Sequence, residues 1–314
     1  MTAPPIDVEL ALDARAELGE GPVWDARSCC LYFVDILRGH VQRFDPGTRE
    51  VRLFRADQPV GAVALTGTDD LLLAVRDGFA RLDPASGRVS MIAVVEGDRP
   101  AGAGLRPGAC DPGRERATAG DLRMNDGACD RAGRFWAGTM ALDERPGAGA
   151  LYRLDRDGGV EMMLRPVSIS NGIDWTGDDR RMYFIDSPTQ SVDLFDFDAT
   201  TGAIANRRTF VRIPPDAGVP DGLTVDADEG VWVALWRGSA VHRYTPDGAL
   251  DRVVRLPVTH PTSCAFGGDG LRDLYITTAS IALDAGERAR QPHAGGLFRC
   301  RPGPAGREPY RFGR

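Results

Sequence analysis

Apolar residues in this chain fall in short runs separated by turn-forming residues, and they do not follow the spacing of a long amphipathic helix. Six runs rich in aromatic and aliphatic residues have the length of buried strands: 29–36, 71–76, 134–140, 181–186, 230–236 and 273–279. A segment rich in Gly, Asp, Thr or Ser precedes each run, and a second apolar run ending in a turn follows it. The pattern therefore predicts six copies of one multistranded unit.

The spacing of these copies predicts how they are arranged. Equivalent positions in successive copies are separated by 39, 64, 48, 48 and 43 residues, at Phe33, Leu72, Trp136, Phe184, Trp232 and Tyr275. A repeat of about 40–50 residues with several short strands is typical of a β-propeller blade. We therefore expect an all-β, six-bladed β-propeller, as a single domain over residues 1–314 with its core at about 15–300. The alternatives are a two-sheet sandwich or a pair of unrelated β domains.

The 64-residue step contains an inserted segment. Residues 96–121 are rich in Gly, Ala, Pro and Arg and show no apolar periodicity. We expect a long loop on one face of the propeller, which serves either as a lid or as a passive loop.

Composition and charge exclude several classes of function. The 314 residues carry a formal net charge of −7, and all 38 positive residues are Arg. An acidic chain without a basic patch argues against nucleic-acid and anionic-membrane partners. The lack of Lys rules out a Lys Schiff base, a pyridoxal phosphate anchor and a P-loop. No two of the four His residues have metal-ligand spacing.

Neither terminus nor interior contains an apolar segment that suggests export or a membrane span. The first residues lack a basic segment followed by an apolar run, and no stretch of 18 apolar residues exists. The six Cys residues form no CxxC pair, and we expect them to be reduced and buried. These features predict a cytoplasmic protein, and they do not indicate its oligomeric state.

Four polar side chains occupy equivalent places at the starts of four repeats: Glu20, Asn125, Asn171 and Asp221. Equivalent places in a propeller converge on its axis, so these side chains should meet. Two carboxylates and two amide carbonyls are oxygen ligands, which suit a hard divalent cation such as Ca²⁺, Mg²⁺ or Mn²⁺. Each residue stands near a Gly, however, so ordinary turn formation is the alternative interpretation of each one alone.

The segments around these residues resemble a known family. They are LGEGPVWD (18–25), RMNDGACDRAGRFWAGTM (123–140), SNGIDWTGDDRRMYFIDS (170–187) and PDGLTVDADEGVWVALW (220–236), with AFGGDGLRDLYITTA and AGGLFR further on. Together they are similar to the SMP-30/gluconolactonase/regucalcin-like (LRE-like) family over roughly residues 15–300. The resemblance implies a six-bladed propeller, hydrolysis of a sugar lactone and one divalent metal ion.

The resemblance also assigns roles to individual residues. Glu20, Asn171 and Asp221 match the family's metal ligands, and Arg123 and Asn125 match its substrate-binding Arg-x-Asn. Asp143 is a further candidate for holding the sugar. Calcium is the first expected ion, with Zn²⁺, Mn²⁺, Mg²⁺ or Fe²⁺ as alternatives. The inserted segment departs from the family pattern and leaves the identity of the lactone open.

A lactonase mechanism follows as a hypothesis. The metal polarises the carbonyl of an aldonolactone, such as glucono- or xylonolactone, and activates a water molecule. Asp221 is the expected general base, and Glu20 is the alternative. No GxSxG motif supports a serine triad. Competing hypotheses are a non-catalytic calcium-binding regulatory protein and a related propeller esterase or organophosphate hydrolase.

Overall fold

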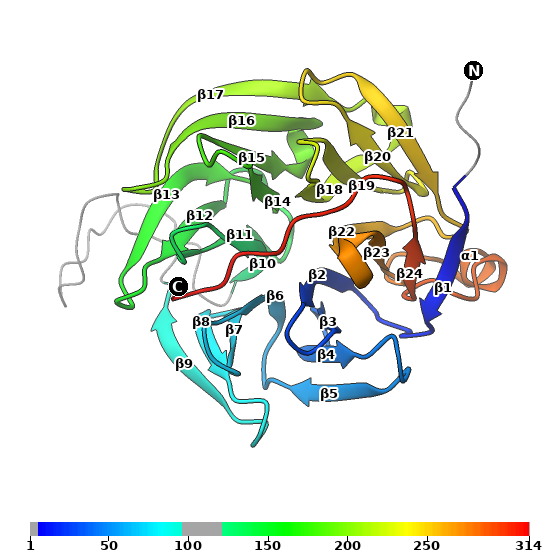
Figure 1. Ribbon diagram of the computed structural model, residues 1–314, viewed down its shortest axis with the longest axis horizontal. Coiled ribbons are helices and arrows are strands. Elements are labelled where there is room, and N and C mark those ends of the chain that lie inside the picture. The colour runs from blue at the N-terminus through cyan, green and yellow to red at the C-terminus, as the bar shows by residue number, and fades with distance from the viewer. Residues whose placement is uncertain (1–5, 96–120, 314) are drawn as a thin grey trace.

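The computed structural model describes residues 6–95 and 121–313, and these form six four-stranded antiparallel sheets in a ring (Figure 1). Each sheet is one blade, so the six-bladed β-propeller predicted from the repeat is confirmed. The inserted segment at 96–121 lies outside the described residues except for Asp121, and its expected role as a lid or a passive loop stays a prediction.

Within the first three blades the strands follow one another in chain order from the axis outwards. Blade 1 contains β2 (Gly19–Asp25), β3 (Cys30–Asp35), β4 (His40–Phe44) and β5 (Val51–Arg55). Blade 2 contains β6 (Val60–Leu65), β7 (Leu71–Val75), β8 (Gly78–Leu82) and β9 (Val89–Val94). Blade 3 contains β10 (Leu122–Cys129), β11 (Phe135–Ala141), β12 (Gly149–Leu154) and β13 (Val160–Val167).

The second half of the ring repeats the plan. Blade 4 contains β14 (Ser170–Trp175), β15 (Arg181–Asp186), β16 (Ser191–Asp198) and β17 (Ala203–Arg212). Blade 5 contains β18 (Val219–Val225), β19 (Val231–Trp236), β20 (Ala240–Tyr244) and β21 (Leu250–Arg255). Blade 6 contains β22 (Pro261–Gly267), β23 (Asp273–Thr278), β24 (Leu297–Cys300) and, outermost, β1 (Val8–Leu12). The short helices are η2 (Ser187–Thr189), η3 (Pro215–Ala217), η4 (Asp269–Leu271) and α1 (Ala285–Arg290).

Blade 6 joins the two ends of the chain. Its outermost strand, β1, comes from the N-terminal region and pairs antiparallel with β24 near the C-terminus, with Val8 opposite Cys300. The sequence pattern did not predict this strand, because a five-residue segment has little periodicity of its own. Pairing between the first and last strands closes the ring without a covalent link.

Apolar layers between neighbouring blades form the core of the described residues, one layer at each of the six blade boundaries. Between blades 3 and 4, Trp136 meets Trp175 edge to face with ring centroids 6.0 Å apart. Between blades 6 and 1, Trp24 stacks on Tyr275 at the same centroid distance. These contacts explain why the repeated runs are apolar on both faces: each inner strand packs against two neighbouring blades.

The last residues of the chain, 301–313, cross the ring as a strap on the side that faces the viewer in Figure 1. The strap makes hydrogen bonds or ion pairs with all six blades, through Asp25, Leu65, Gly133, Trp175, Ala227 and Leu271 among others. Arg311 forms a buried ion pair with Asp25 of blade 1. Burial alone would raise the pKa of Asp25, but hydrogen bonds from Arg311, Ser28 and Arg27 lower it.

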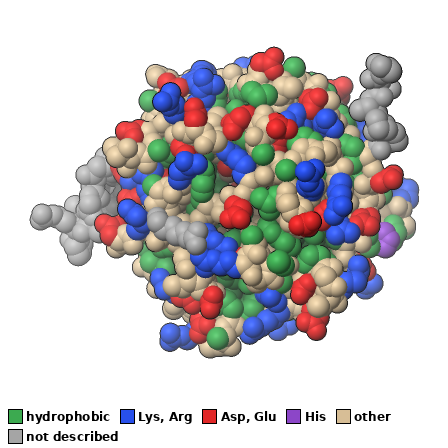
Figure 2. Space-filling model, viewed as in Figure 1, with side chains coloured by type: hydrophobic (Ala, Val, Ile, Leu, Met, Phe, Trp, Pro, Cys, Tyr) green, Lys and Arg blue, Asp and Glu red, His purple; other side chains and the backbone are tan. Residues whose placement is uncertain are grey.

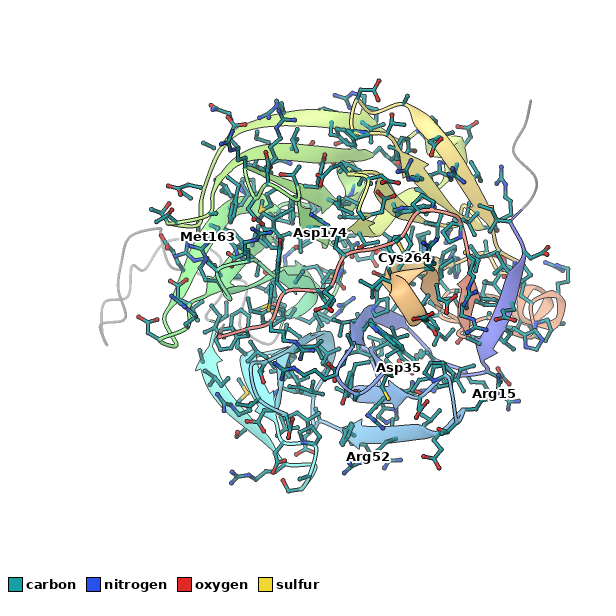
Figure 3. The ribbon with its side chains drawn as sticks, viewed as in Figure 1. Arg15, Asp35, Arg52, Met163, Asp174 and Cys264 are labelled. Carbon is teal, nitrogen blue, oxygen red and sulfur yellow. The ribbon has the colours of Figure 1, made fainter. Side chains whose placement is uncertain are left out.

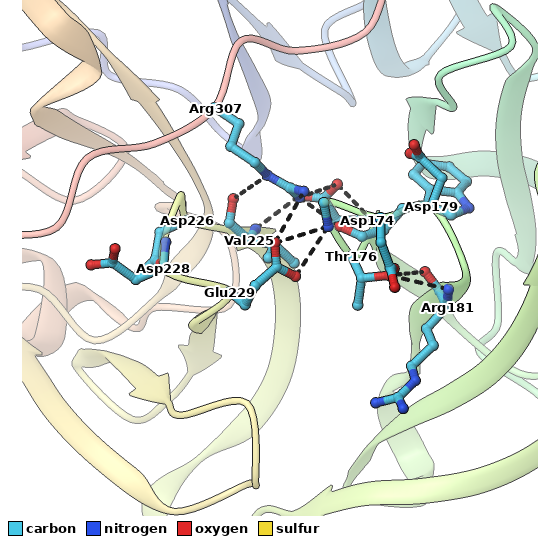
Figure 4. A network of polar contacts seen from close by, with 12 residues as sticks. Asp174, Thr176, Asp179, Arg181, Val225, Asp226, Asp228, Glu229 and Arg307 are labelled. Atoms are coloured by element: carbon cyan, nitrogen blue, oxygen red, sulfur yellow. Dashed lines mark hydrogen bonds and ion pairs between the residues drawn. The ribbon is translucent and has the colours of Figure 1, made fainter.

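Arg307 attaches the middle of the strap to blades 4 and 5 (Figure 4). Its guanidinium donates to the carbonyl oxygen of Trp175 at 2.5 Å and to that of Val225 at 3.4 Å. The same group lies 3.6 Å from the carboxylate of Asp174 and 3.9 Å from that of Glu229. The strap is therefore an integral part of the folded ring.

Beneath the strap the axis of the ring encloses a chamber of about 120 Å³. Its walls include Asp126, Asp174 and Cys264, and the strap residues Arg307 and Tyr310 form part of its cover. Asp174 and Cys264 lie near the middle of the ring in Figure 3, far from Arg15, Arg52 and Met163 at its edge. The strap covers the ends of the inner strands, so the opposite mouth of the axis is where these strands begin.

The outer surface on the strap side carries Arg and acidic side chains interspersed with one another (Figure 2). Within the described residues, no helix has the length and apolar character needed to cross a membrane. The five described Cys residues are free thiols, and four of them are buried.

Candidate functional site

All six inner strands have an irregular register near the point where they begin, and four polar side chains lie at these irregularities. The breaks fall between Glu20 and Val23, Val60 and Ala62, Met124 and Gly127, Ser170 and Ile173, Pro220 and Leu223, and Pro261 and Ser263. Such bulges redirect side chains out of the regular alternation. Glu20, Asn125, Asn171 and Asp221 are therefore presented at the same mouth of the ring, as the repeat predicted.

Two buried aspartates fix the chain just before the polar residues of blades 1 and 4. Asp35 accepts hydrogen bonds from the backbone N–H groups of Glu17 and Leu18, and Asp186 accepts from Ser168 and Ile169. Each aspartate ends the second strand of its blade. Neither was assigned a role from the sequence, although the shared patterns LYFVD and MYFID were the available signal.

A hydrogen-bond network joins blades 3, 4 and 5 across this mouth. Arg123 Nη1 donates to Asn125 Oδ1 at 2.5 Å, and Asn125 Nδ2 donates to Asn171 Oδ1 at 2.7 Å. Asn171 Nδ2 donates to Ser187 Oγ at 2.7 Å, and this hydroxyl donates to the carbonyl oxygen of Pro220 at 2.6 Å. Pro220 directly precedes Asp221, so the network links the polar residues of three blades.

The network also fixes which amide atom each asparagine presents. Each Oδ1 atom accepts one hydrogen bond and retains a second lone pair, but that of Asn125 accepts from the cationic Arg123, which would repel a metal ion, whereas that of Asn171 accepts from the neutral amide of Asn125. Asn171 is therefore suited to bind a cation through oxygen. Asn125 is better suited to orient Arg123 and Asn171.

Three buried carboxyl groups lie close enough to affect one another. Burial raises the pKa of Glu20 well above its ordinary value, and the charges of Asp221 and Asp126 raise it further. Burial and Asp126 also raise the pKa of Asp221. Burial raises the pKa of Asp126 to about 6. The axis of the ring therefore holds three buried carboxyl groups whose simultaneous ionisation is disfavoured.

Asp126 was not assigned a role from the sequence. It stands directly between Asn125 and Gly127, and its Oδ1 atom accepts from the backbone N–H of Gly127 at 2.7 Å. The repeat places only the asparagine of this Asn-Asp-Gly segment at the axis, and no residue pattern shows that its neighbour reaches the axis as well.

Arg123 supplies the positive charge of the site. Burial lowers the pKa of its guanidinium to about 10, and the charges of Glu20, Glu144 and Asp221 oppose that shift. Only 6 % of Arg123 is exposed. A guanidinium held this firmly can offer its donors in a fixed geometry.

Asp143 is exposed, unlike the four buried residues at the starts of the inner strands. Its exposed carboxylate forms an ion pair with Arg145 at 2.8 Å, whereas the neighbouring Glu144 acts on the charge of Arg123. Glu144 has a φ of 57°, a turn conformation that reverses the direction of the chain at this point. The role of Asp143 in holding a sugar stays a prediction.

The donor set fits a divalent cation. Glu20 and Asp221 are buried carboxylates whose pKa values are raised, so each would gain from a nearby positive charge. Among residues 6–95 and 121–313, no three His, Cys, Asp or Glu side chains meet as a metal site. The Asn171 amide oxygen is available as a further oxygen ligand beside these two carboxylates.

Blade 2 contributes a glycine, Gly61, where four other blades present a polar side chain. A Cβ atom at this position would collide with the carbonyl oxygens of Asn125 and Met124. We expect Gly61→Ala to push blade 3 away, displace Asn125 and lower stability by about 1–3 kcal/mol. Urea unfolding measures the stability of this variant against the wild type.

The control for this substitution is Gly286→Ala. The added methyl group would meet only side-chain atoms of Asp284 and Arg290, at 3.3 Å, in the exposed helix α1. This variant should match or slightly exceed the wild type in stability. If the two variants had the same stability in urea, the close contact between blades 2 and 3 at Gly61 would not be needed to position Asn125.

The geometry can be compared with known proteins. Residues 18–280 match the family described as SMP-30/Gluconolactonase/LRE-like region. The chain belongs to this family. Regucalcin of Gallus gallus is 37% identical over 314 residues, covering 98% of each chain. YvrE of Bacillus subtilis (strain 168), named as a putative sugar lactone lactonase, is 35% identical over 308 residues, covering 98% of this chain and 99% of its own.

A solved structure has the same architecture. The structure of a calcium-binding protein, regucalcin, from Agrobacterium tumefaciens aligns with a TM-score of 0.88 and 26% identity, covering 98% of each chain. Membership of this family, expected from the motifs, is therefore confirmed. The chain is a lactonase-family propeller.

Proposed function

We propose that this chain hydrolyses a sugar lactone to the aldonic acid in a reaction that depends on one divalent cation. The observation that carries the proposal is the meeting of Glu20, Asn171 and Asp221 with the Arg123–Asn125 pair at one mouth of the ring. The name of the relative YvrE supports the same class of substrate.

Glu20 and Asp221 would hold the cation through their carboxylates, and Asn171 would hold it through Oδ1. Ligands that are all oxygen favour Ca²⁺, and they also suit Mg²⁺ and Mn²⁺, whereas Zn²⁺ and Fe²⁺ more often take nitrogen or sulfur. When bound, such a cation polarises the lactone carbonyl and lowers the pKa of a coordinated water.

The protein's own residues then carry the proton. Asp221 accepts a proton from water as the water oxygen bonds to the lactone carbonyl carbon. The bond between that carbon and the ring oxygen then breaks, and Asp221 returns the proton to the departing oxygen. A carboxylate beside the reacting water can serve as the general base, and we assign this role to Asp221. Glu20 is the alternative base.

Arg123 and Asn125 position the substrate in this proposal. The guanidinium donates to carbonyl or hydroxyl oxygens of the sugar, and its hydrogen bond to Asn125 keeps it directed at the site. Asn125 also holds Asn171, so a single residue aligns the substrate-binding and cation-binding sides.

The test is hydrolysis of a panel of aldonolactones, including glucono- and xylonolactone, measured by acid release in weak buffer. Protein stripped with a chelator should lose turnover by at least about 100-fold, and Ca²⁺ or another single divalent ion should restore it. A blank without protein corrects for spontaneous opening of the lactones.

Two results would contradict the proposal. Undiminished turnover in the stripped protein would exclude a required cation. Tight cation binding without turnover on any lactone would favour a calcium-binding protein without catalysis, in line with the description of the Agrobacterium relative as calcium-binding. Hydrolysis of other esters alone would assign a different substrate class to the same site.

A further inference from the structure

A second polar cavity lies at the boundary of blades 4 and 5, near the outer edge of the ring. It is a groove of about 480 Å³ between the end of β17 and the outer strands β20 and β21, which are neighbours at the top right in Figure 1. Its lining includes Arg212, Asp216, His242, Tyr244 and Arg255. We refer to it as the blade 4–5 groove. None of these residues belongs to the candidate active site.

Two arginines of the groove are unpaired within the described part of the chain. Arg212 ends β17 on one wall, and Arg255 ends β21 on the other. Neither guanidinium makes a hydrogen bond or an ion pair with any residue that the structure describes. In contrast, Arg243 of the same blade pairs with both Asp226 and Asp251. Two free guanidiniums on facing walls attract an anion between them.

A buried histidine lies between these walls. Only 7 % of His242 is exposed, and its Nδ1 atom lies 3.2 Å from the hydroxyl of Tyr244. Burial raises the pKa of Tyr244 to about 12, so this hydroxyl keeps its proton. Burial and the charge of Arg255 lower the pKa of His242, so its ring is neutral at pH 7.

The tyrosine hydroxyl can donate to Nδ1 of His242 or accept from it, depending on which ring nitrogen carries the proton. When the tyrosine hydroxyl donates to Nδ1, a neutral imidazole carries its proton on Nε2. No described residue accepts a hydrogen bond from Nε2 of His242. Nε2 of His242 is not one of the fully buried polar atoms without a partner, so it is open to the groove that His242 lines. A ligand in the groove would satisfy this donor.

We propose that the blade 4–5 groove binds a small oxyanion, a phosphate or carboxylate group held by Arg212, Arg255 and the Nε2–H group of His242. Asp216 at the rim of the groove can accept from a hydroxyl of the same ligand. The proposal does not depend on the lactone chemistry of the axial site.

The test is a titration followed by nuclear magnetic resonance of protein labelled with ¹⁵N at its histidine rings. The chain has only four His residues, and a His242→Gln variant assigns the signal. Inorganic phosphate and sodium gluconate are the two probes, each added at constant ionic strength. The Nε2 signal of His242 should shift saturably with at least one probe, with a dissociation constant below about 10 mM.

The variant that tests the binding residues is Arg212→Gln combined with Arg255→Gln. Both side chains are exposed, so the fold should be retained, and binding should weaken by at least about tenfold. Arg88→Gln removes an exposed arginine of blade 2 and should leave the titration unchanged. A shift with phosphate alone identifies a phosphate ligand, and a shift with gluconate alone identifies a carboxylate ligand.

Either of two results would overturn the proposal: no saturable shift of His242 with either probe, or an unchanged dissociation constant in the double variant. The titration is run on Asp221→Asn protein without added metal, so that gluconate binding at the axial site does not contribute. Failure of lactone hydrolysis would leave this result unaffected.

Discussion

Asp221→Asn should abolish lactone hydrolysis and, at the same time, make the metal-free protein more stable. Loss of a general base lowers turnover by about 10²–10⁴-fold, and loss of a cation ligand adds to this. The gain in stability follows from charge, because Asp221 is buried beside Asp126 and its pKa is raised. Asparagine keeps the shape of the side chain without the charge.

The sign of the pH dependence follows from the raised pKa. A carboxyl group whose pKa is higher in the folded state stabilises the fold most when it is protonated. That stability is lost as the pH rises through the folded-state pKa. The advantage of Asp221→Asn should therefore be small near pH 4 and grow toward neutral pH. Each 1 kcal/mol of electrostatic destabilisation that the substitution removes raises Tm by about 2 °C in a chain of this length.

Calorimetry of chelator-treated protein at several pH values measures the stability, and acid release measures turnover. Asp69→Asn is the matched control, since it removes the same charge from an exposed turn and should change neither property. Turnover within tenfold of the wild type would show that Asp221 is not the base. An unchanged or lower Tm at neutral pH would show that the buried carboxylates do not repel one another.

Removal of the strap, by ending the chain at Arg301, should lower Tm by at least about 10 °C. The deletion removes hydrogen bonds to several blades and exposes the chamber at the axis. It also leaves Asp25 buried without Arg311. Breaking a buried ion pair from one side typically costs about 3–5 kcal/mol, so Arg311→Ala alone should reproduce much of the loss.

Differential scanning calorimetry of the truncated chain and of Arg311→Ala measures both effects. Arg301→Gln is the control, because Arg301 is exposed and Asp273 keeps a second ion-pair partner, Arg299, so the loss should be at most about 1 kcal/mol. The lowered pKa of Asp25 means that its contribution is present above its ordinary value of 3.8 and is lost as the pH falls through the folded-state value. The penalty of Arg311→Ala should therefore shrink in acid. A deletion without effect on Tm would show that the ring does not need the strap.

The sequence predicted the parts of this molecule that recur. The six apolar runs repeat, so the blades could be counted, and Glu20, Asn171 and Asp221 stand at matching places in their repeats. Residues whose surroundings come from distant segments were not predicted. The strap is an Arg-, Pro- and Gly-rich segment whose partners lie up to 286 residues away, as Arg311 lies from Asp25.

Local backbone geometry is a second reason why some residues of the site could not be predicted from the sequence. Asp143 and Glu144 are neighbouring acidic residues, and only the turn conformation at Glu144 determines which of them approaches Arg123. The polar pair His242 and Tyr244 was also missed, because a two-residue spacing along one strand says nothing of the groove beside it.

The pairing of β1 with β24 has a consequence for the order in which the protein is synthesised. Val8–Leu12 is synthesised before every other strand of the ring, but its hydrogen-bonding partner, Leu297–Cys300, is synthesised after all the others. At about 5–20 residues per second, the first strand waits roughly 15–60 s with an unpaired edge. During that interval blades 1 to 5 can form in turn, whereas blade 6 and the strap can be completed only after β24 and the residues that follow it have been synthesised.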